Sequence, residues 1–168
     1  MTDTQLSPGN DATVSPDIDL SKAPQPERFK MRIELLDEGS KSNLLAETDN
    51  LRIQIRCYSA QGGENAMHTH HHQDHSFVIL QGQARFRFPD GGEMDLGRNE
   101  GIMLPAGAYY CFQNPGPDPL VLMRIASLAK NEGDPEVRLG LHGKQIEPTS
   151  AENNRPRKIK VREGEFFE

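Results

Sequence analysis

Histidine is concentrated in one short stretch of this chain. Five of the six histidines lie at positions 68–75. Two glycines precede the stretch at positions 62 and 63, and an apolar run that ends at Gly82 follows it. Imidazole is the commonest metal ligand, and it is the one side chain that titrates near neutral pH. The cluster therefore predicts a metal site, and its spacing says more than its composition.

Short alternating segments separated by turns surround the histidine stretch. Residues 51–58 alternate apolar and polar side chains almost perfectly, which predicts a strand with one face in water. Residues 37–43 are expected to form a loop. Because no convincing helix separates the alternating segments, the sequence predicts an all-β sandwich or barrel. The expected strands are 29–35, 51–58, 84–88, 93–96, 108–114 and 120–126.

The spacing of the histidines allows several of them to converge. His68 and His70 are two residues apart, and residues two apart on a strand point to the same face. His75 follows a turn-prone Gln-Asp pair at the head of the next strand, so it can swing back to the same point. His71 and His72 fall in the connecting loop. The alternative is a surface polyhistidine patch with no binding role.

The stretch at 62–82 resembles the first conserved motif of the cupins. That motif contains a glycine, His-x-His, a glutamate and a closing glycine, and here His75 stands at the glutamate position. Residues 99–114 resemble the second cupin motif, including its Pro-x-Gly turn, with Tyr110 in place of the expected histidine. The resemblance covers residues 30–127 and neither terminus.

The resemblance implies a fold and a ligand set. Cupins are antiparallel jelly-roll β-barrels that hold a metal near the middle of the barrel, so this fold is expected here. The resemblance carries over His68 and His70 as metal ligands, and it places His75 and Tyr110 at the other ligand positions. Tyr110 is then a fourth ligand or, as we slightly prefer, a catalytic donor to metal-bound water or substrate. A third alternative is a barrel-lining tyrosine.

The expected cofactor is one divalent transition metal. Exchanging glutamate for His75 makes the ligand set more neutral, which favours iron, zinc, nickel or copper over manganese, with iron preferred. The favoured function is O2-dependent, dioxygenase-type chemistry on a small organic molecule. A second function is that of a metal Lewis-acid isomerase, cyclase or lyase in which Tyr110 acts as acid or base. A third is small-ligand binding without catalysis.

Composition and charge restrict the partners. The net charge is −6 and the isoelectric point is about 5.5, which disfavours nucleic acid as a partner. No apolar run approaches membrane-spanning length, and no signal peptide is evident, so a cytoplasmic location without membrane partners is expected. The cysteines, Cys57 and Cys111, are expected to be free thiols. The partners expected are a small-molecule substrate and, by resemblance, a second subunit in a homodimer.

Three parts make up the chain. Residues 1–27 are expected to form a flexible N-terminal arm, residues 28–127 the barrel, and residues 128–168 a polar C-terminal extension. Either terminal arm is a candidate for exchange between subunits. Phe166 and Phe167 close the extension, and we expect them to dock on the protein because they are apolar.

A few polar residues outside the motifs are further candidates. Arg56 and Arg124 would bind an anionic substrate if they faced inward, although an outward position is the default for arginine. Glu64 precedes the histidines and is a candidate for the barrel mouth. His142 would reach the site only if the C-terminal segment folded over the mouth.

Overall fold

The computed structural model describes residues 19–62, 65–128, 134, 136–147, 150 and 158–168. Most of the expected N-terminal arm lies outside these residues. The elements are η1 Leu20–Lys22, β1 Ile33–Glu38, β2 Ser40–Glu47, β3 Leu51–Tyr58, β4 His68–Thr69, β5 His75–Gln81, β6 Ala84–Arg87, β7 Glu93–Leu96, β8 Gly101–Leu104, β9 Cys111–Gln113, β10 Leu120–Ser127, β11 Leu139–Gly140 and β12 Lys160–Phe167.

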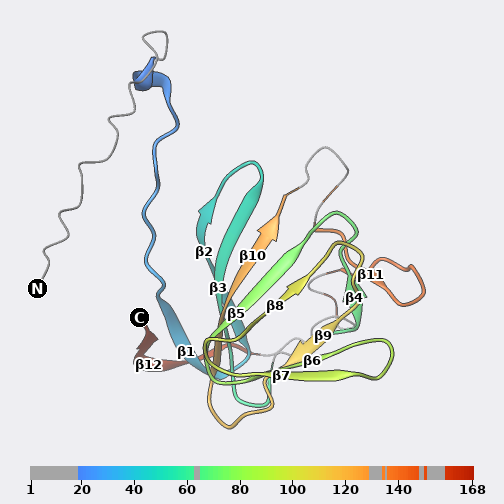
Figure 1. Cartoon of the computed structure of the whole chain (residues 1–168). Helices are drawn as coiled ribbons and strands as arrows, with labels where there is room; N and C mark the ends of the chain where they lie inside the picture. Colours follow the sequence, from blue (N-terminus) through green and yellow to red (C-terminus); the bar gives the residue numbers. More distant parts are fainter. Residues whose placement is uncertain (1–18, 63–64, 129–133, 135, 148–149, 151–157) are drawn as a thin grey trace, which may run out of the picture.

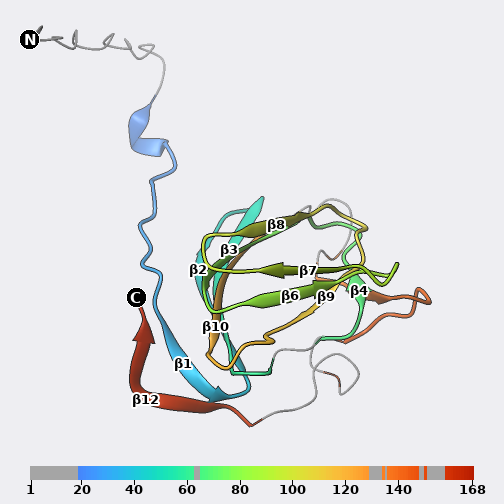
Figure 2. The same ribbon diagram turned by 60° about the horizontal axis from the view of Figure 1, so that its bottom comes forward.

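Two antiparallel sheets form the barrel (Figures 1 and 2). The larger sheet has the order β2-β3-β10-β5-β8, and the smaller has the order β7-β6-β9. Apolar side chains from both sheets meet between them, including Phe77 of β5, Phe86 of β6, Phe112 of β9 and Leu122 of β10. The protein is therefore an all-β, antiparallel jelly roll, as the sequence predicts.

A second apolar cluster lies on the outer face of the larger sheet. Ile55 and Cys57 of β3 join Val121 of β10, and Ile33 and Leu36 of β1 cover them. Strand β3 thus turns its apolar face outward, under β1. Its polar face points into the barrel, so the alternation of residues 51–58 is confirmed but the expectation of a water-exposed polar face is wrong.

Strand β2 corrects a further expectation. Residues 37–43 were expected to form a loop, yet a strand begins at Ser40 and pairs with β3 from Ser40 opposite Tyr58 onward. Gly39 has a φ of 86°, a conformation that glycine adopts without a steric penalty. This residue lets β1 turn directly into β2, so polar residues join the sheet at its edge.

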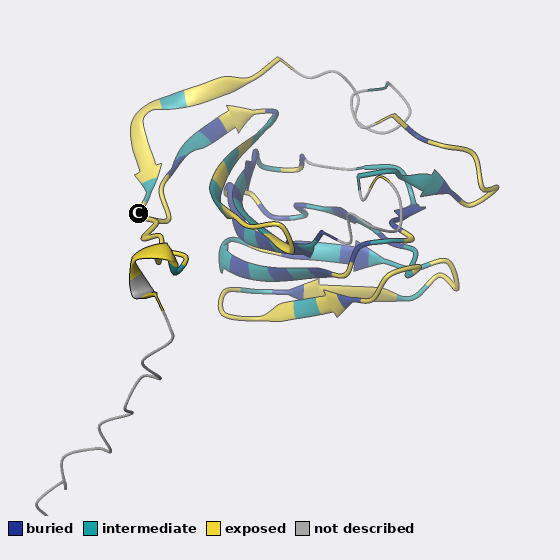
Figure 3. Cartoon of the chain, turned by 90° about the horizontal axis from the view of Figure 1, so that it is seen from above, coloured by how far each residue is buried: buried dark blue, intermediate teal, exposed yellow. Residues whose placement is uncertain are grey.

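Two strands from the C-terminal extension attach to the barrel. β12 pairs with β1, where Phe167 lies opposite Ile33 and packs against the outer cluster. Phe166 lies under the guanidinium of Arg32, 3.8 Å from it. The expectation that these phenylalanines dock on the protein is confirmed. Most of β12 is nevertheless exposed (Figure 3).

Two simpler expectations can be compared directly with the structure. Cys57 is buried and Cys111 is partly buried, and neither is part of a disulfide within the described residues, as expected. Among the described residues, there is no helix with the length and apolar character needed to cross a membrane.

Candidate functional site

Four side chains identified from the sequence lie together at one end of the barrel. His68 lies in β4 and His70 just after it, His75 begins β5, and Tyr110 forms an isolated bridge with His68. The ring centroid of His68 is 5.2 Å from that of His70 and 4.8 Å from that of Tyr110, and the rings of His70 and His75 are 4.5 Å apart. All four side chains are buried.

A buried hydrogen-bond network connects this group to Arg124. The hydroxyl of Tyr110 lies 2.8 Å from Nδ1 of His75, and Nη2 of Arg124 lies 2.7 Å from Nε2 of the same ring. Nη2 of Arg124 also donates to Oε1 of Gln73 at 2.9 Å, and Nη1 donates to Oε1 of Gln54 at 2.9 Å. Two strands and a turn therefore hold the guanidinium inside the barrel.

The position of Arg124 is opposite to the default expectation from the sequence. Leu120, Leu122 and Arg124 alternate along β10, and the two leucines belong to the barrel core. Because residues two apart share a face, the arginine must also point inward. Arg56 is inward for the same reason, since it alternates with Tyr58 and donates to the Tyr58 hydroxyl at 3.3 Å.

Both ring nitrogens of His75 have close partners. Nε2 lies 2.7 Å from Nη2 of Arg124, which can only donate, and 2.7 Å from Oε1 of Gln73, which can only accept. Nδ1 pairs with the Tyr110 hydroxyl, which can donate or accept. Burial, followed by the charge of Arg124, lowers the pKa of His75 well below its usual range. Burial raises the pKa of Tyr110 to about 12. Both groups are therefore neutral at physiological pH.

His68 has a different arrangement. Its Nδ1 lies 2.7 Å from the carbonyl oxygen of Ala66, so Nδ1 must carry the proton and Nε2 the lone pair. Burial lowers the pKa of His68 to about 4. A neutral imidazole that is oriented by a backbone carbonyl is a common arrangement for a metal ligand.

The side chains of His68, His70, His75 and Tyr110 fit a metal ion only in part. Both ring nitrogens of His75 bond to protein groups, and one of these is the cationic Arg124. Over the ranges that the structure describes, no group of three His, Cys, Asp or Glu side chains is arranged to hold a metal ion. His68 and His70 are compatible with such an ion, whereas His75 would first have to leave Arg124. The four-residue metal site therefore stays a prediction.

Arg138 is a residue that sequence reasoning missed. Its neighbour Leu139 begins β11, which pairs with β4 beside His68, and its own carbonyl accepts from the amide of Ile146 at 2.9 Å. These contacts place Arg138 close enough to Arg56 for the two guanidiniums to interact electrostatically. A two-residue strand in a polar segment has no detectable periodicity, so the sequence offered no signal for this residue.

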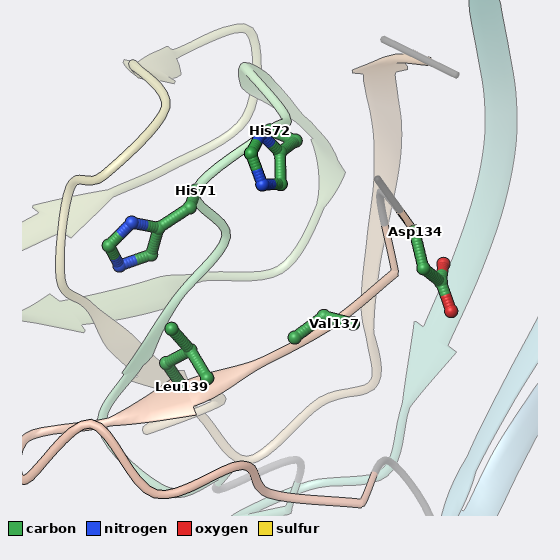
Figure 4. Close-up of a pocket in the computed structure, with 5 residues that line it drawn as sticks. All are labelled: His71, His72, Asp134, Val137 and Leu139. Carbon is green, nitrogen blue, oxygen red and sulfur yellow. The ribbon is translucent and has the colours of Figure 1, made fainter. Parts of the chain in front are cut away.

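The remaining candidates lie outside the buried group. His71 and His72 lie in the turn after β4 and line a shallow pocket of about 210 Å³ with Val137 and Leu139 (Figure 4). His142 is exposed, although the C-terminal segment does fold over this end of the barrel. Glu64 lies outside the described residues.

The comparisons with known proteins agree with this architecture. Residues 56–126 match the family model described as a cupin domain. This chain contains a cupin domain. Its fold is also similar to that of the cupin domain of Schizosaccharomyces pombe Cnp3, with a TM-score of 0.50 and 20% identity, covering 55% of this chain and 63% of that one.

Curated relatives of this cupin domain are much longer proteins. The chain is 36% identical over 88 residues to mannose-1-phosphate guanylyltransferase of Escherichia coli K12, and 37% identical over 89 residues to mannose-1-phosphate guanylyltransferase ManC of Salmonella typhimurium. Each match covers 52% of this chain but only 18% of the relative. The similarity therefore concerns one part of those enzymes.

Proposed function

We propose that the cupin domain binds a small carbohydrate related to mannose 1-phosphate at the polar end of its barrel. The observation that carries this proposal is the buried network that joins Tyr110, His75, Gln73 and Arg124. A group of several fixed donors and acceptors suits a polyhydroxylated molecule, because each hydroxyl both donates and accepts. The printed names of the curated relatives support the choice of ligand class.

Isothermal titration of the full chain with mannose, mannose 1-phosphate and glycerol tests this proposal. We expect the mannose ligands to bind and glycerol not to bind. His75→Asn should weaken mannose binding by about tenfold, because a buried polar partner is lost. Tyr109→Phe is the matched control, since this tyrosine lies beside the site but is not part of the network. Absence of binding to either mannose ligand at millimolar concentration would contradict the proposal.

A metal-dependent enzyme is the second candidate. The carbonyl of Ala66 orients His68 so that Nε2 offers its lone pair, and His70 lies beside it. A bound transition metal would supply Lewis-acid or O2 chemistry there. In either case the residues of this chain would position the substrate, and the Tyr110 hydroxyl would stay hydrogen-bonded to Nδ1 of His75.

Metal analysis of untagged protein, with His68→Ala as the comparison, separates this candidate from the first. Near-stoichiometric metal that disappears in the variant would support a metal centre. Iron with oxygen uptake would favour the dioxygenase, and zinc or nickel without oxygen uptake would favour the isomerase, cyclase or lyase. Protein that binds mannose without retained metal would favour the simple binding function.

A homodimer is also proposed for this chain. Leu51 and Met103 are 40% and 63% exposed. Strand register places both on the outer face of the larger sheet, the same face as Ile53 and Ile125. Light scattering of Met103→Glu should show a smaller species than the wild-type protein, because a charge would lie in an apolar contact. An unchanged dimer would rule out this face as the interface.

A further inference from the structure

Three arginines lie toward the polar end of the barrel. Arg56 of β3 pairs with Leu122 of β10, and Arg124 follows two residues later on the same inner face. Arg138 directly precedes β11, which pairs with β4 at His68, and the three charges act on one another. Arg124 is only 4% exposed. Within the described part of the chain, its hydrogen-bond partners Gln54, Gln73 and His75 are all neutral. A buried cation that lacks an anionic partner is costly. The site therefore holds a positive charge that its hydrogen-bond partners do not neutralise.

The carboxylate that acts on these arginines is already engaged with another cation. Glu136 is the carboxylate that acts electrostatically on both Arg124 and Arg138. Its Oε1 is paired with Nη1 of Arg52, and Nε of the same Arg52 is paired with Glu47. Because Arg52 also pairs with Glu136, the negative charge of Glu136 only partly offsets the positive charge of the three guanidiniums.

Two buried donors in the same region also lack partners. Nε of Arg138 and Nε2 of Gln73 have no hydrogen-bond acceptor among the residues that the structure describes. Each such donor costs about 1–3 kcal/mol when it stays unsatisfied. An oxyanion bound between the arginines would supply acceptor oxygens and negative charge together.

We propose that Arg56, Arg124 and Arg138 form a built-in cationic centre that binds the phosphoryl group of a small ligand without a metal ion. Guanidinium groups match phosphate oxygens in charge and in geometry. The neutral partners of Arg124 hold it rigidly, whereas Arg56 and Arg138 are only half-buried and can reach an incoming anion. This inference deepens the proposed function, because a sugar phosphate carries such a group, but the binding of phosphate alone can be tested separately.

The test is a calorimetric titration of the full chain with inorganic phosphate in the presence of EDTA. We expect saturable binding. Arg56→Gln and Arg138→Gln should each weaken phosphate affinity by about tenfold or more, since each removes a charged hydrogen-bond donor. Arg98→Gln removes the same charge from an exposed turn and should leave the affinity unchanged. The two half-buried arginines are tested first because loss of the buried Arg124 also affects folding.

Several results would overturn the inference. These are no phosphate binding, binding that is lost in EDTA, or equal losses in Arg98→Gln and Arg138→Gln. Binding of phosphate without binding of either mannose ligand would support the cationic centre and contradict the carbohydrate proposal. Binding of mannose without binding of phosphate would support the carbohydrate proposal and contradict the cationic centre.

Discussion

Nη2 of Arg124 lies 2.7 Å from Nε2 of His75, and both side chains are buried. His75 stands where the cupin motif has a metal-binding glutamate, so a guanidinium contacts the residue that was expected to contact a metal ion. The charge of Arg124 is retained at neutral pH, because burial and the neighbouring Arg56 lower its pKa only to about 10. The contact joins the neighbouring strands β5 and β10 on the inner face of the larger sheet.

Replacement of Arg124 by alanine should strongly destabilise the protein. Gln54, Gln73 and His75 would each lose a buried donor, and a cavity would remain. We expect a loss of about 3–5 kcal/mol in the free energy of unfolding, measured by urea denaturation. Arg124→Met fills most of the volume and should lose less. A loss below about 1 kcal/mol in Arg124→Ala would show that the network contributes little to stability.

Tyr110→Phe tests the hydroxyl without removing the ring. The ring belongs to the barrel core, and the hydroxyl is hydrogen-bonded to Nδ1 of His75 at 2.8 Å. The variant should leave the buried Nδ1 without this partner and lose about 1–3 kcal/mol of unfolding free energy. Tyr109→Phe should change the unfolding free energy much less. Equal effects in the two variants would argue against the assigned hydrogen bond.

The buried thiol of Cys57 should make stability fall at alkaline pH. Burial raises the pKa of Cys57 to about 11, whereas an exposed thiol titrates at about 8.5. Between these values the native state keeps the proton and the unfolded state releases it, so the unfolding free energy decreases as pH rises. The slope should be at most about 1.4 kcal/mol per pH unit.

Cys57→Val keeps an apolar side chain on the outer face of β3 and provides the comparison. The difference between wild type and variant should be constant below pH 8 and should change as pH increases to 10.5 if the thiol is responsible, as expected from linkage. A constant difference over the whole range would assign the alkaline loss to other groups.

Two neighbouring phenylalanines at the end of β12 provide a matched pair. Phe167 packs against the outer cluster, whereas Phe166 is 36% exposed under Arg32. Phe167→Ala should cost about 2–3 kcal/mol because it uncovers the apolar face under β1. Phe166→Ala should cost about 0.5–1 kcal/mol, the size of an exposed cation–π contact. Thermal and urea unfolding of both variants would measure this order, and the reverse order would contradict the packing described.

Much of the fold could be predicted from local sequence. Alternation located β3 and β6, and the cupin motifs located His68, His70, His75 and Tyr110, which the structure brings together. Alternation shows that a strand has two different faces. It does not show which face turns inward, because that depends on what else covers the strand. Here β1 covers the apolar face of β3.

The positions of the arginines could not be predicted from local sequence. Arg124 is inward because it shares a face with two core leucines, and a residue-type preference for the surface cannot override that register. Arg138 reaches the site through the pairing of β11 with β4, which joins distant parts of the chain. The few residues that form such a long-range pair have no sequence pattern from which the pairing could be predicted.

The pairing of Ile33 with Phe167 has a consequence for the order of assembly. Among the described residues β1 is the first strand and β12 the last, so they can pair only after the ribosome has made all the intervening residues. Contacts between distant residues also carry a large loop-closure entropy and form slowly. We therefore expect β1 to lack its β12 partner, and Ile33 to lack the cover of Phe167, during synthesis. The newly made chain should be most prone to aggregation just before β12 joins β1.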